Sequence, residues 1–130
     1  MPPLHLLDSI ALVTPDMSDA VIVTGSHGGS SAAGFVLAMS HKPFVVFFND
    51  AGIGKDNAGI AALAMLQSQG ICAAVYAHTS ARIGDAQDGL DNGCITRVNH
   101  AAELAGVCEG QMVRAAVELL QTPRARSAAN

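Results

Sequence analysis

At 130 residues the chain is long enough to form one domain with a buried core, and no internal repeat divides it. Half of the residues are hydrophobic and only 14% are charged, so we expect copies of the chain to associate; an alanine- and glycine-rich monomer is the alternative. The formal net charge of −4, with no basic cluster before the last few residues and no Trp, argues against nucleic acid as a partner.

Five short apolar segments are predicted to be strands, because β-branched or aromatic residues fill them and turn residues bound them. The first is Ser9–Thr14. The short link Pro15–Asp19 follows it, which favours a hairpin and an antiparallel first strand. The other predicted strands are Ala20–Thr24, Phe44–Phe48, Ile71–Ala77 and Cys94–Val98.

Helices are predicted between and after these strands, at residues 30–40, 57–69, 85–92, 100–104 and 111–121. Alternating strands and helices predict an α/β fold. We expect a single-domain three-layer sandwich around a mainly parallel sheet of four to five strands, flavodoxin- or Rossmann-like. This domain covers residues 1–122, and residues 123–130 are expected to form a flexible C-terminal tail.

The first residues and the cysteines indicate a reducing cytoplasm. The segment MPPLHLLDS lacks the basic start of a signal peptide, and no apolar run approaches the roughly 18 residues needed to span a bilayer. Cys72, Cys94 and Cys108 are odd in number and show no metal-binding spacing. We therefore predict a cytoplasmic protein that binds no membrane, no metal ion and no cofactor.

The main predicted strands all end in polar residues, although the chain has few charges. Between Ala20 and Ala81 the charged residues are Lys42, Asp50, Lys55 and Asp56, and the last three lie in the single loop NDAGIGKD. The carboxyl ends of parallel strands share one edge of a sheet, where open α/β sheets bind ligands. We therefore predict a functional site formed by Ser26-His27, Asn49-Asp50, His78-Thr79-Ser80 and Asn99-His100.

The junction TGSHG, Thr24 to Gly28, leaves three alternatives open. Its small-x-nucleophile-x-small spacing fits a nucleophile elbow with Ser26 as the nucleophile, although it lacks the first Gly of G-x-S-x-G. It also fits an anion cradle, in which Gly28 and Gly29 let backbone N–H groups approach a ligand closely. The third alternative is a turn that needs glycine only for close packing. His27 counts against this alternative, because an imidazole on such a turn fills no core.

Two other loops supply charged candidates. In NDAGIGKD, Asp50 could act as a base or orient His27, and the flanking glycines let the loop carry Lys55 to a ligand. In HTSARIGD, Arg82 suits recognition of a carboxylate or phosphate, because its guanidinium group donates two parallel hydrogen bonds. Asp85 either holds Arg82 in place or caps the following helix.

These residues predict a small enzyme, a hydrolase by preference, that acts on a small anionic carboxylate or amide metabolite. His27 would be the general acid/base, and a serine would be the nucleophile if the chemistry is acyl transfer. A cofactor-free lyase or isomerase is an alternative, and so is a flavodoxin-like module that binds a flavin or nucleotide phosphate. The predicted catalytic residues are Ser26, His27, Asp50, Lys55 and Ser80, and the predicted substrate contacts are Gly28, Gly29, Asn49, Arg82, Asp85, Asn99 and His100.

Overall fold

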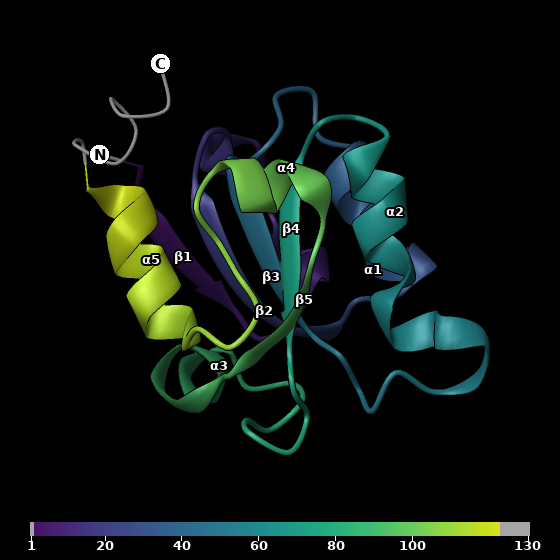
Figure 1. The fold of residues 1–130 in the computed structure, drawn as a ribbon. Helices are drawn as coiled ribbons and strands as arrows, with labels where there is room; N and C mark the ends of the chain where they lie inside the picture. Colours follow the sequence, from purple (N-terminus) through teal and green to yellow (C-terminus); the bar gives the residue numbers. More distant parts are fainter. Residues whose placement is uncertain (1, 123–130) are drawn as a thin grey trace.

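The computed structural model describes residues 2–122, without the side chain of Asp56. Five strands form one sheet in the order β1-β2-β3-β4-β5 (Figure 1). Strands β1 to β4 are parallel to one another, and β5 is antiparallel to β4. The predicted single-domain α/β fold with a mostly parallel sheet is confirmed. The strands are β1 (Leu4–Leu7), β2 (Val21–His27), β3 (Val45–Asn49), β4 (Cys72–Tyr76) and β5 (Ile95–Val98).

Each strand pairs with the strand that precedes it in the chain, so the strand order never reverses within the sheet. Flavodoxin-like and Rossmann sheets contain such a reversal, and their ligands bind at it. The carboxyl edge of this sheet therefore has no binding crevice dictated by topology. A site at this edge has to be argued from the residues that lie there.

The predicted strand Ser9–Thr14 and its hairpin are wrong. The first strand is β1, which is parallel to β2 and places Leu4 beside Val21. The chain between them forms two 3₁₀ turns, η1 (Ile10–Leu12) and η2 (Pro15–Met17). The Ser9 hydroxyl accepts a hydrogen bond from the Ala11 N–H and so caps the first turn, and a proline with a fixed φ begins the second. These two turns provide the parallel connection without a long helix.

β5 is antiparallel because the chain enters it from the carboxyl edge of the sheet. The preceding helix α3 (Ala86–Asn92) has seven residues, about 10 Å, and lies beneath this edge rather than along a face (Figure 1). The residues that follow β5 therefore lie at the opposite edge, where the Asn99 N–H donates to the carbonyl of Ala73 near the start of β4. The predicted placement of Asn99 and His100 in the site is wrong.

The two faces of the sheet are covered by different helices. α1 (Ser30–Leu37) and α2 (Ala61–Gln67) pack on one face, and α4 (His100–Leu104) and α5 (Val113–Gln121) pack on the other. Side chains of successive strand residues point to opposite faces. The strands therefore supply two cores, one with Ile22, Val46, Phe48 and Val75 and the other with Val21, Val23, Phe47 and Tyr76.

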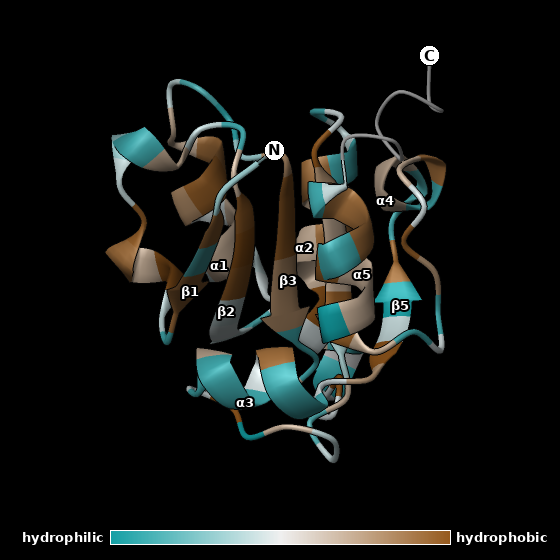
Figure 2. Cartoon of the chain, turned by 90° about the vertical axis from the view of Figure 1, so that its left-hand side faces the viewer, coloured by the Kyte–Doolittle hydropathy of each residue, from teal (hydrophilic) through white to brown (hydrophobic). Residues whose placement is uncertain are grey.

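Figure 2 shows the hydrophobic strands enclosed between the layers, with hydrophilic residues on the outer sides of α3 and α5. In the part of the chain that the structure describes, no helix has the length and apolar character required to cross a membrane. The predicted tail, residues 123–130, lies outside the described residues.

Candidate functional site

The carboxyl ends of β2, β3 and β4 lie next to one another, as the strand pattern predicts. His27 at the end of β2 pairs with Asn49 at the end of β3, and Asn49 pairs with Tyr76 at the end of β4. Asp50 follows the end of β3 directly, and His78 is the second residue after the end of β4. The edge therefore brings together polar residues from segments that are far apart in the chain.

Asp50 and His78 form the closest pair of titratable side chains at this edge. Asp50 is only 6% exposed. Its Oδ1 accepts hydrogen bonds from the backbone N–H groups of Gly52 (2.8 Å) and His78 (3.0 Å) and lies 3.3 Å from His78 Nδ1. Its Oδ2 lies 3.4 Å from the Thr96 hydroxyl. Two backbone N–H groups and a hydroxyl therefore donate to this carboxyl group.

The carboxylate also fixes the protonation pattern of the imidazole. When Asp50 is ionised it can only accept hydrogen bonds, so the neutral imidazole beside it carries its proton on Nδ1 and leaves Nε2 as the basic nitrogen. The ring lies against Gly52, where a Cβ would come within 3.4 Å of the His78 ring carbon Cε1. The His78 side chain is 52% exposed. A buried carboxylate thus orients an imidazole that a solute can reach.

A guanidinium group lines the same part of the edge as His78, and its charge is attracted by the nearby Asp88 carboxylate. His78 and Arg82 line one open depression of about 350 Å³, together with Thr79, Ser80, Ala81 and Asp88. The ion pairs between described residues join His78 with Asp50, His100 with Glu103 and Arg114 with Asp91, so the Arg82 side chain takes part in none. A guanidinium group without an ion-pair partner can bind the carboxylate or phosphate of a ligand.

The backbone around Arg82 is held in place by Asp88. The Asp88 carboxylate accepts a hydrogen bond of 2.7 Å from the Arg82 N–H. This hydrogen bond has the largest effect in lowering the pKa of the Asp88 carboxyl group, and a hydrogen bond from the Asn92 side chain has the next largest. Asp85 accepts a hydrogen bond from the Asp88 N–H (3.0 Å) and makes no ion pair with Arg82. Of the two predicted roles of Asp85, the structure thus shows the helix cap.

The two candidate serine nucleophiles are both bonded to the backbone. The Ser80 hydroxyl donates to the carbonyl of Ala77 (2.6 Å) and accepts from the N–H of Cys94 (3.0 Å), and the Ser26 hydroxyl accepts from the N–H of Ile10 (3.0 Å). Neither hydroxyl contacts an imidazole. Ser26 also lies within β2 and has no positive φ, so the strained turn of a nucleophile elbow is not formed.

The glycines after β2 allow close packing. The Gly28 N–H donates to the carbonyl of Asn49 (3.0 Å), and a Cβ at Gly28 would come within 2.8 Å of the Gly59 carbonyl oxygen. Gly28 therefore matches the third alternative for this turn. A Cβ at Gly29 would lie 2.7 Å from His27 Nε2, so the His27 ring folds over Gly29.

His27 and Asp50 do not form the predicted pair. The His27 side chain is exposed and makes no hydrogen bond or ion pair with any described residue. The Asp50 carboxyl group instead contacts His78. Asn49 is buried and joins two loops, because its amide donates to the Ala81 carbonyl (3.0 Å) and accepts from the Ala51 N–H (2.7 Å). Lys55 is exposed at the start of η3 (Lys55–Ile60), on the loop that follows Asp50.

Asn99 and His100 serve the opposite edge of the sheet. The buried Asn99 amide accepts from the N–H groups of Ala73 (3.1 Å) and Ala102 (2.9 Å) and donates to the carbonyls of Ile71 and Leu63. Asn99 is therefore the cap of α4 and not a substrate contact at the carboxyl edge. His100 is exposed and lies 3.6 Å from Glu103.

One residue of the site, Thr96, was not predicted. It reaches Asp50 because β5 is antiparallel, and no local feature of the sequence indicates this direction. Among the described residues no group of three His, Cys, Asp or Glu is placed to hold a metal ion. Cys72, Cys94 and Cys108 are free thiols, and burial raises the pKa of Cys72.

No model of a known protein family matches the chain, and no curated protein or solved structure matches it either. Its chemistry is therefore inferred from the geometry of its own residues.

Proposed function

We propose that this protein is a small enzyme that carries out general acid–base chemistry on a small anionic carboxylate or amide compound. His78 is the proton-transfer group, Asp50 is the residue that positions it, and Arg82 binds the anionic group of the substrate. The observation that supports this proposal is the buried Asp50 carboxylate, which lies 3.3 Å from His78 Nδ1. His78 and Arg82 line the same depression.

Hydrolysis by an activated water is the reaction that these residues suit best. With the substrate anion on Arg82, His78 Nε2 takes a proton from water as the oxygen attacks the carbonyl carbon. The imidazolium then gives this proton to the leaving nitrogen or oxygen as the carbon–heteroatom bond breaks. Asp50 stays ionised throughout and stabilises the imidazolium, as carboxylates do beside catalytic histidines.

A cofactor-free lyase or isomerase is the second candidate. The same imidazole can take a proton from a carbon next to a carboxylate and return it to another atom. The backbone hydrogen bonds of Ser26 and Ser80 favour both water-mediated hydrolysis and this alternative over an acyl-enzyme, because neither hydroxyl is paired with a base.

The flavin-binding alternative receives less support. It requires aromatic side chains at the edge of the sheet that can stack on a ring. The aromatic residues close to this edge in the sequence, Phe47, Phe48 and Tyr76, are fully buried and present no face to a ligand. We therefore do not propose a flavin or nucleotide as a cofactor.

Exchange of single histidines tests the proposal. Wild-type protein is incubated with a panel of small amides and esters that carry a carboxylate, and proton release is followed. His78→Gln should lower kcat by about 10²–10⁴-fold, the usual contribution of a positioned proton-transfer group. His100→Gln, at the opposite edge, is the matched control and should leave kcat unchanged. His27→Gln should also retain activity, since His27 has no orienting partner. Loss of activity in His27→Gln but not in His78→Gln would refute the assignment.

A further inference from the structure

The two helical layers differ sharply in charge. α4 and α5, which cover the other face of the sheet, each carry at least one charged residue, whereas α1 and α2 carry none. A helix on the outside of a soluble domain usually presents charged or polar residues to water, and a helix without them is usually covered. The outer side of α1 and α2 therefore lacks the charged residues that helices exposed to water usually carry.

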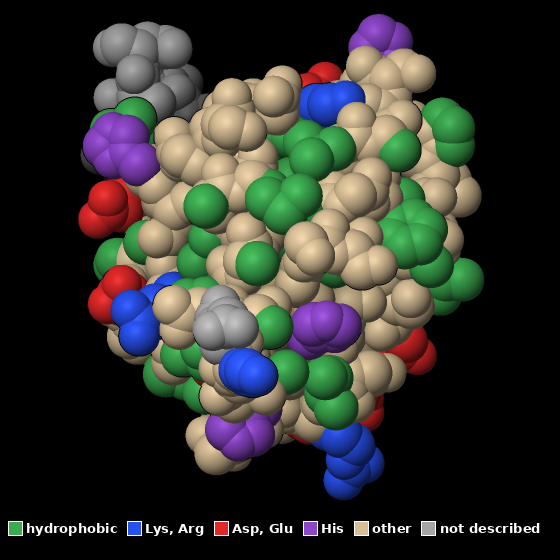
Figure 3. All heavy atoms as spheres, turned by 90° about the vertical axis from the view of Figure 1, so that its right-hand side faces the viewer, with side chains coloured by type: hydrophobic (Ala, Val, Ile, Leu, Met, Phe, Trp, Pro, Cys, Tyr) green, Lys and Arg blue, Asp and Glu red, His purple; other side chains and the backbone are tan. Residues whose placement is uncertain are grey.

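The outward residues of this layer are small, apolar or uncharged. We define the α1–α2 face by the exposed residues Ser31, Gly34 and Phe35 of α1, Ala38 at its C-cap and Ala64 of α2. Figure 3 shows this side of the molecule, with hydrophobic and uncharged atoms over most of its upper and middle part and with His and Lys or Arg side chains below them. The nearest charge is that of Lys42, whose ammonium group donates to the carbonyls of Leu37 (3.0 Å) and Met39 at the end of α1.

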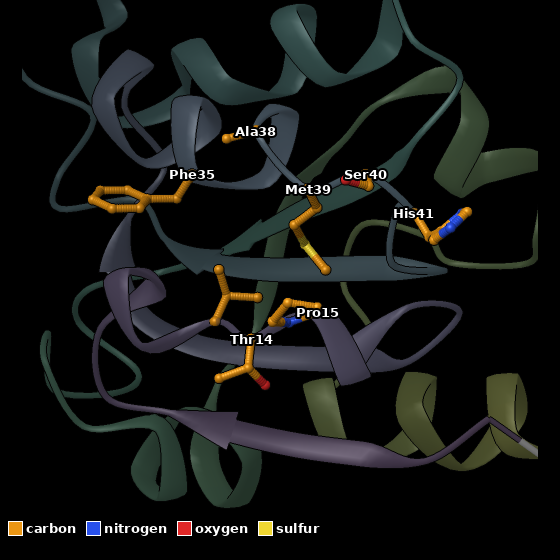
Figure 4. Close-up of a pocket in the computed structure, with 8 residues that line it drawn as sticks. Thr14, Pro15, Phe35, Ala38, Met39, Ser40 and His41 are labelled. Carbon is orange, nitrogen blue, oxygen red and sulfur yellow. The ribbon is translucent and has the colours of Figure 1, made fainter.

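The α1–α2 face continues into a pocket of about 300 Å³ at the end of α1. The pocket lies between α1 and the η1–η2 segment, with Phe35 at one end, His41 at the other and the Met39 side chain pointing toward Pro15 between them (Figure 4). None of the residues that line it is acidic, lysine or arginine. Phe35 is 44% exposed at its rim, and Leu12 of η1 is 59% exposed.

We propose that the α1–α2 face binds the same face of a second copy of the chain across a two-fold axis. A two-fold interface pairs a patch with itself, so any net charge in the patch would meet its own sign. The chain has a formal net charge of −4, yet no Asp, Glu, Lys or Arg is among the residues of this face or of its pocket. The absence of charge suits self-association, whereas a charged partner would be matched by opposite charges. The exposed Phe35 supports the same interpretation, because aromatic side chains are typical of the centres of interfaces.

A stable dimer needs an area of standard size. A standard interface takes about 800 Å² from each partner, which is about an eighth of the 6246 Å² that this chain exposes. The depression next to His78 lies at the carboxyl edge rather than on the α1–α2 face, so the dimer does not depend on the proposed reaction.

Gly34→Glu is the decisive variant. Gly34 lies within α1, and a Cβ there meets no atom within 4 Å, so the monomer can accept a longer side chain. Glutamate is also a better helix former than glycine, so folding should not suffer. In the dimer, however, the two-fold axis would place two new carboxylates in an uncharged contact. The dissociation constant should rise at least about 100-fold.

The masses of wild type, Gly34→Glu and Phe35→Ser are measured by light scattering and sedimentation at tens of micromolar, with circular dichroism to confirm folding. Ala115→Glu, an exposed site on α5, is the matched control. We expect a wild-type mass of twice 13.3 kDa, retained in Ala115→Glu and lost in the two α1 variants. A wild-type monomer would overturn the proposal. So would a Gly34→Glu protein that remains dimeric, because the contact would then involve another face.

Discussion

Replacement of Gly28 by Ala should destabilise the domain, whereas the same replacement at Gly34 should stabilise it. A Cβ at Gly28 would come within 2.8 Å of the Gly59 carbonyl oxygen, 3.0 Å of Val75 Cγ1 and 3.3 Å of Phe48 Cβ. The closest of these atoms belongs to the backbone, which cannot rotate away. At Gly34 the space around the added methyl group is empty.

The expected magnitudes follow from these contacts. Overpacking of a buried site destabilises a protein by about 1–3 kcal/mol. Replacing glycine by alanine also lowers the conformational entropy of the unfolded chain, which offsets about 0.4–1 kcal/mol of this loss. Gly28→Ala should therefore lower the free energy of unfolding by about 1–2 kcal/mol. Gly34→Ala should raise it by about 1 kcal/mol, the difference between the helix propensities of glycine and alanine. For a domain of this size, 1 kcal/mol corresponds to about 4 °C in Tm.

Urea denaturation and thermal melts of the two variants and wild type provide the measurement. Protein concentration must be equal in all samples, because association changes apparent stability. If Gly28→Ala melts at or above the wild-type temperature, the turn after β2 does not pack on the 50–59 loop. Gly28 would then be available to a ligand rather than required for packing.

Three further changes have defined outcomes. Burial raises the pKa of Tyr76 above its ordinary 10.0, so its contribution to stability is complete below that pH and falls as pH rises further. Because Tyr76 is the chain's single tyrosine, tyrosinate absorbance should appear only together with unfolding on alkaline titration. Asn99→Ala should cost about 2–4 kcal/mol in urea denaturation, since four backbone groups lose their partner, whereas the exposed Asn92→Ala should cost under about 0.5 kcal/mol. Ala51 has a φ of +51°, so Ala51→Gly should raise Tm slightly, while Ala58→Gly, at an ordinary φ, should lower it; a decrease in both would contradict the strained loop.

Most of the fold could be predicted from local patterns. The four predicted strands from Ala20 onward, and all five helices, appear in the structure with ends shifted by a few residues. These elements are visible in the sequence because apolar runs are bounded by Gly, Pro and polar residues. β1 was missed because LHLL is short and begins after two prolines, while the more β-branched Ser9–Thr14 drew the assignment.

The direction of β5 could not be predicted for a different reason. A helix between two strands normally predicts a parallel crossover, because it runs back along the sheet. α3 is too short to do so, and its hydrophobic pattern gives no indication of where it lies. This one direction determines that Thr96 reaches Asp50 and that Asn99 does not.

The predicted strand ends do lie at one edge, but the predicted pair of Asp50 with His27 is not formed. The polar ends of β2, β3 and β4 identified the edge, because parallel strands bring their ends together. The choice between His27 and His78 as the partner of Asp50 depends on backbone geometry. The N–H of His78 binds the same oxygen as its ring nitrogen, which is a tertiary contact without a sequence pattern.

The sequential strand order also has a consequence for how the protein is made. Every strand joins a partner that the ribosome has already released, and none has to insert between two strands that are already paired. The sheet can therefore grow from β1 toward β5 during translation, at the rate at which residues emerge. The growing sheet then exposes only its two outer strands at any time, β1 and the strand added last, which limits the unpaired edges that promote aggregation.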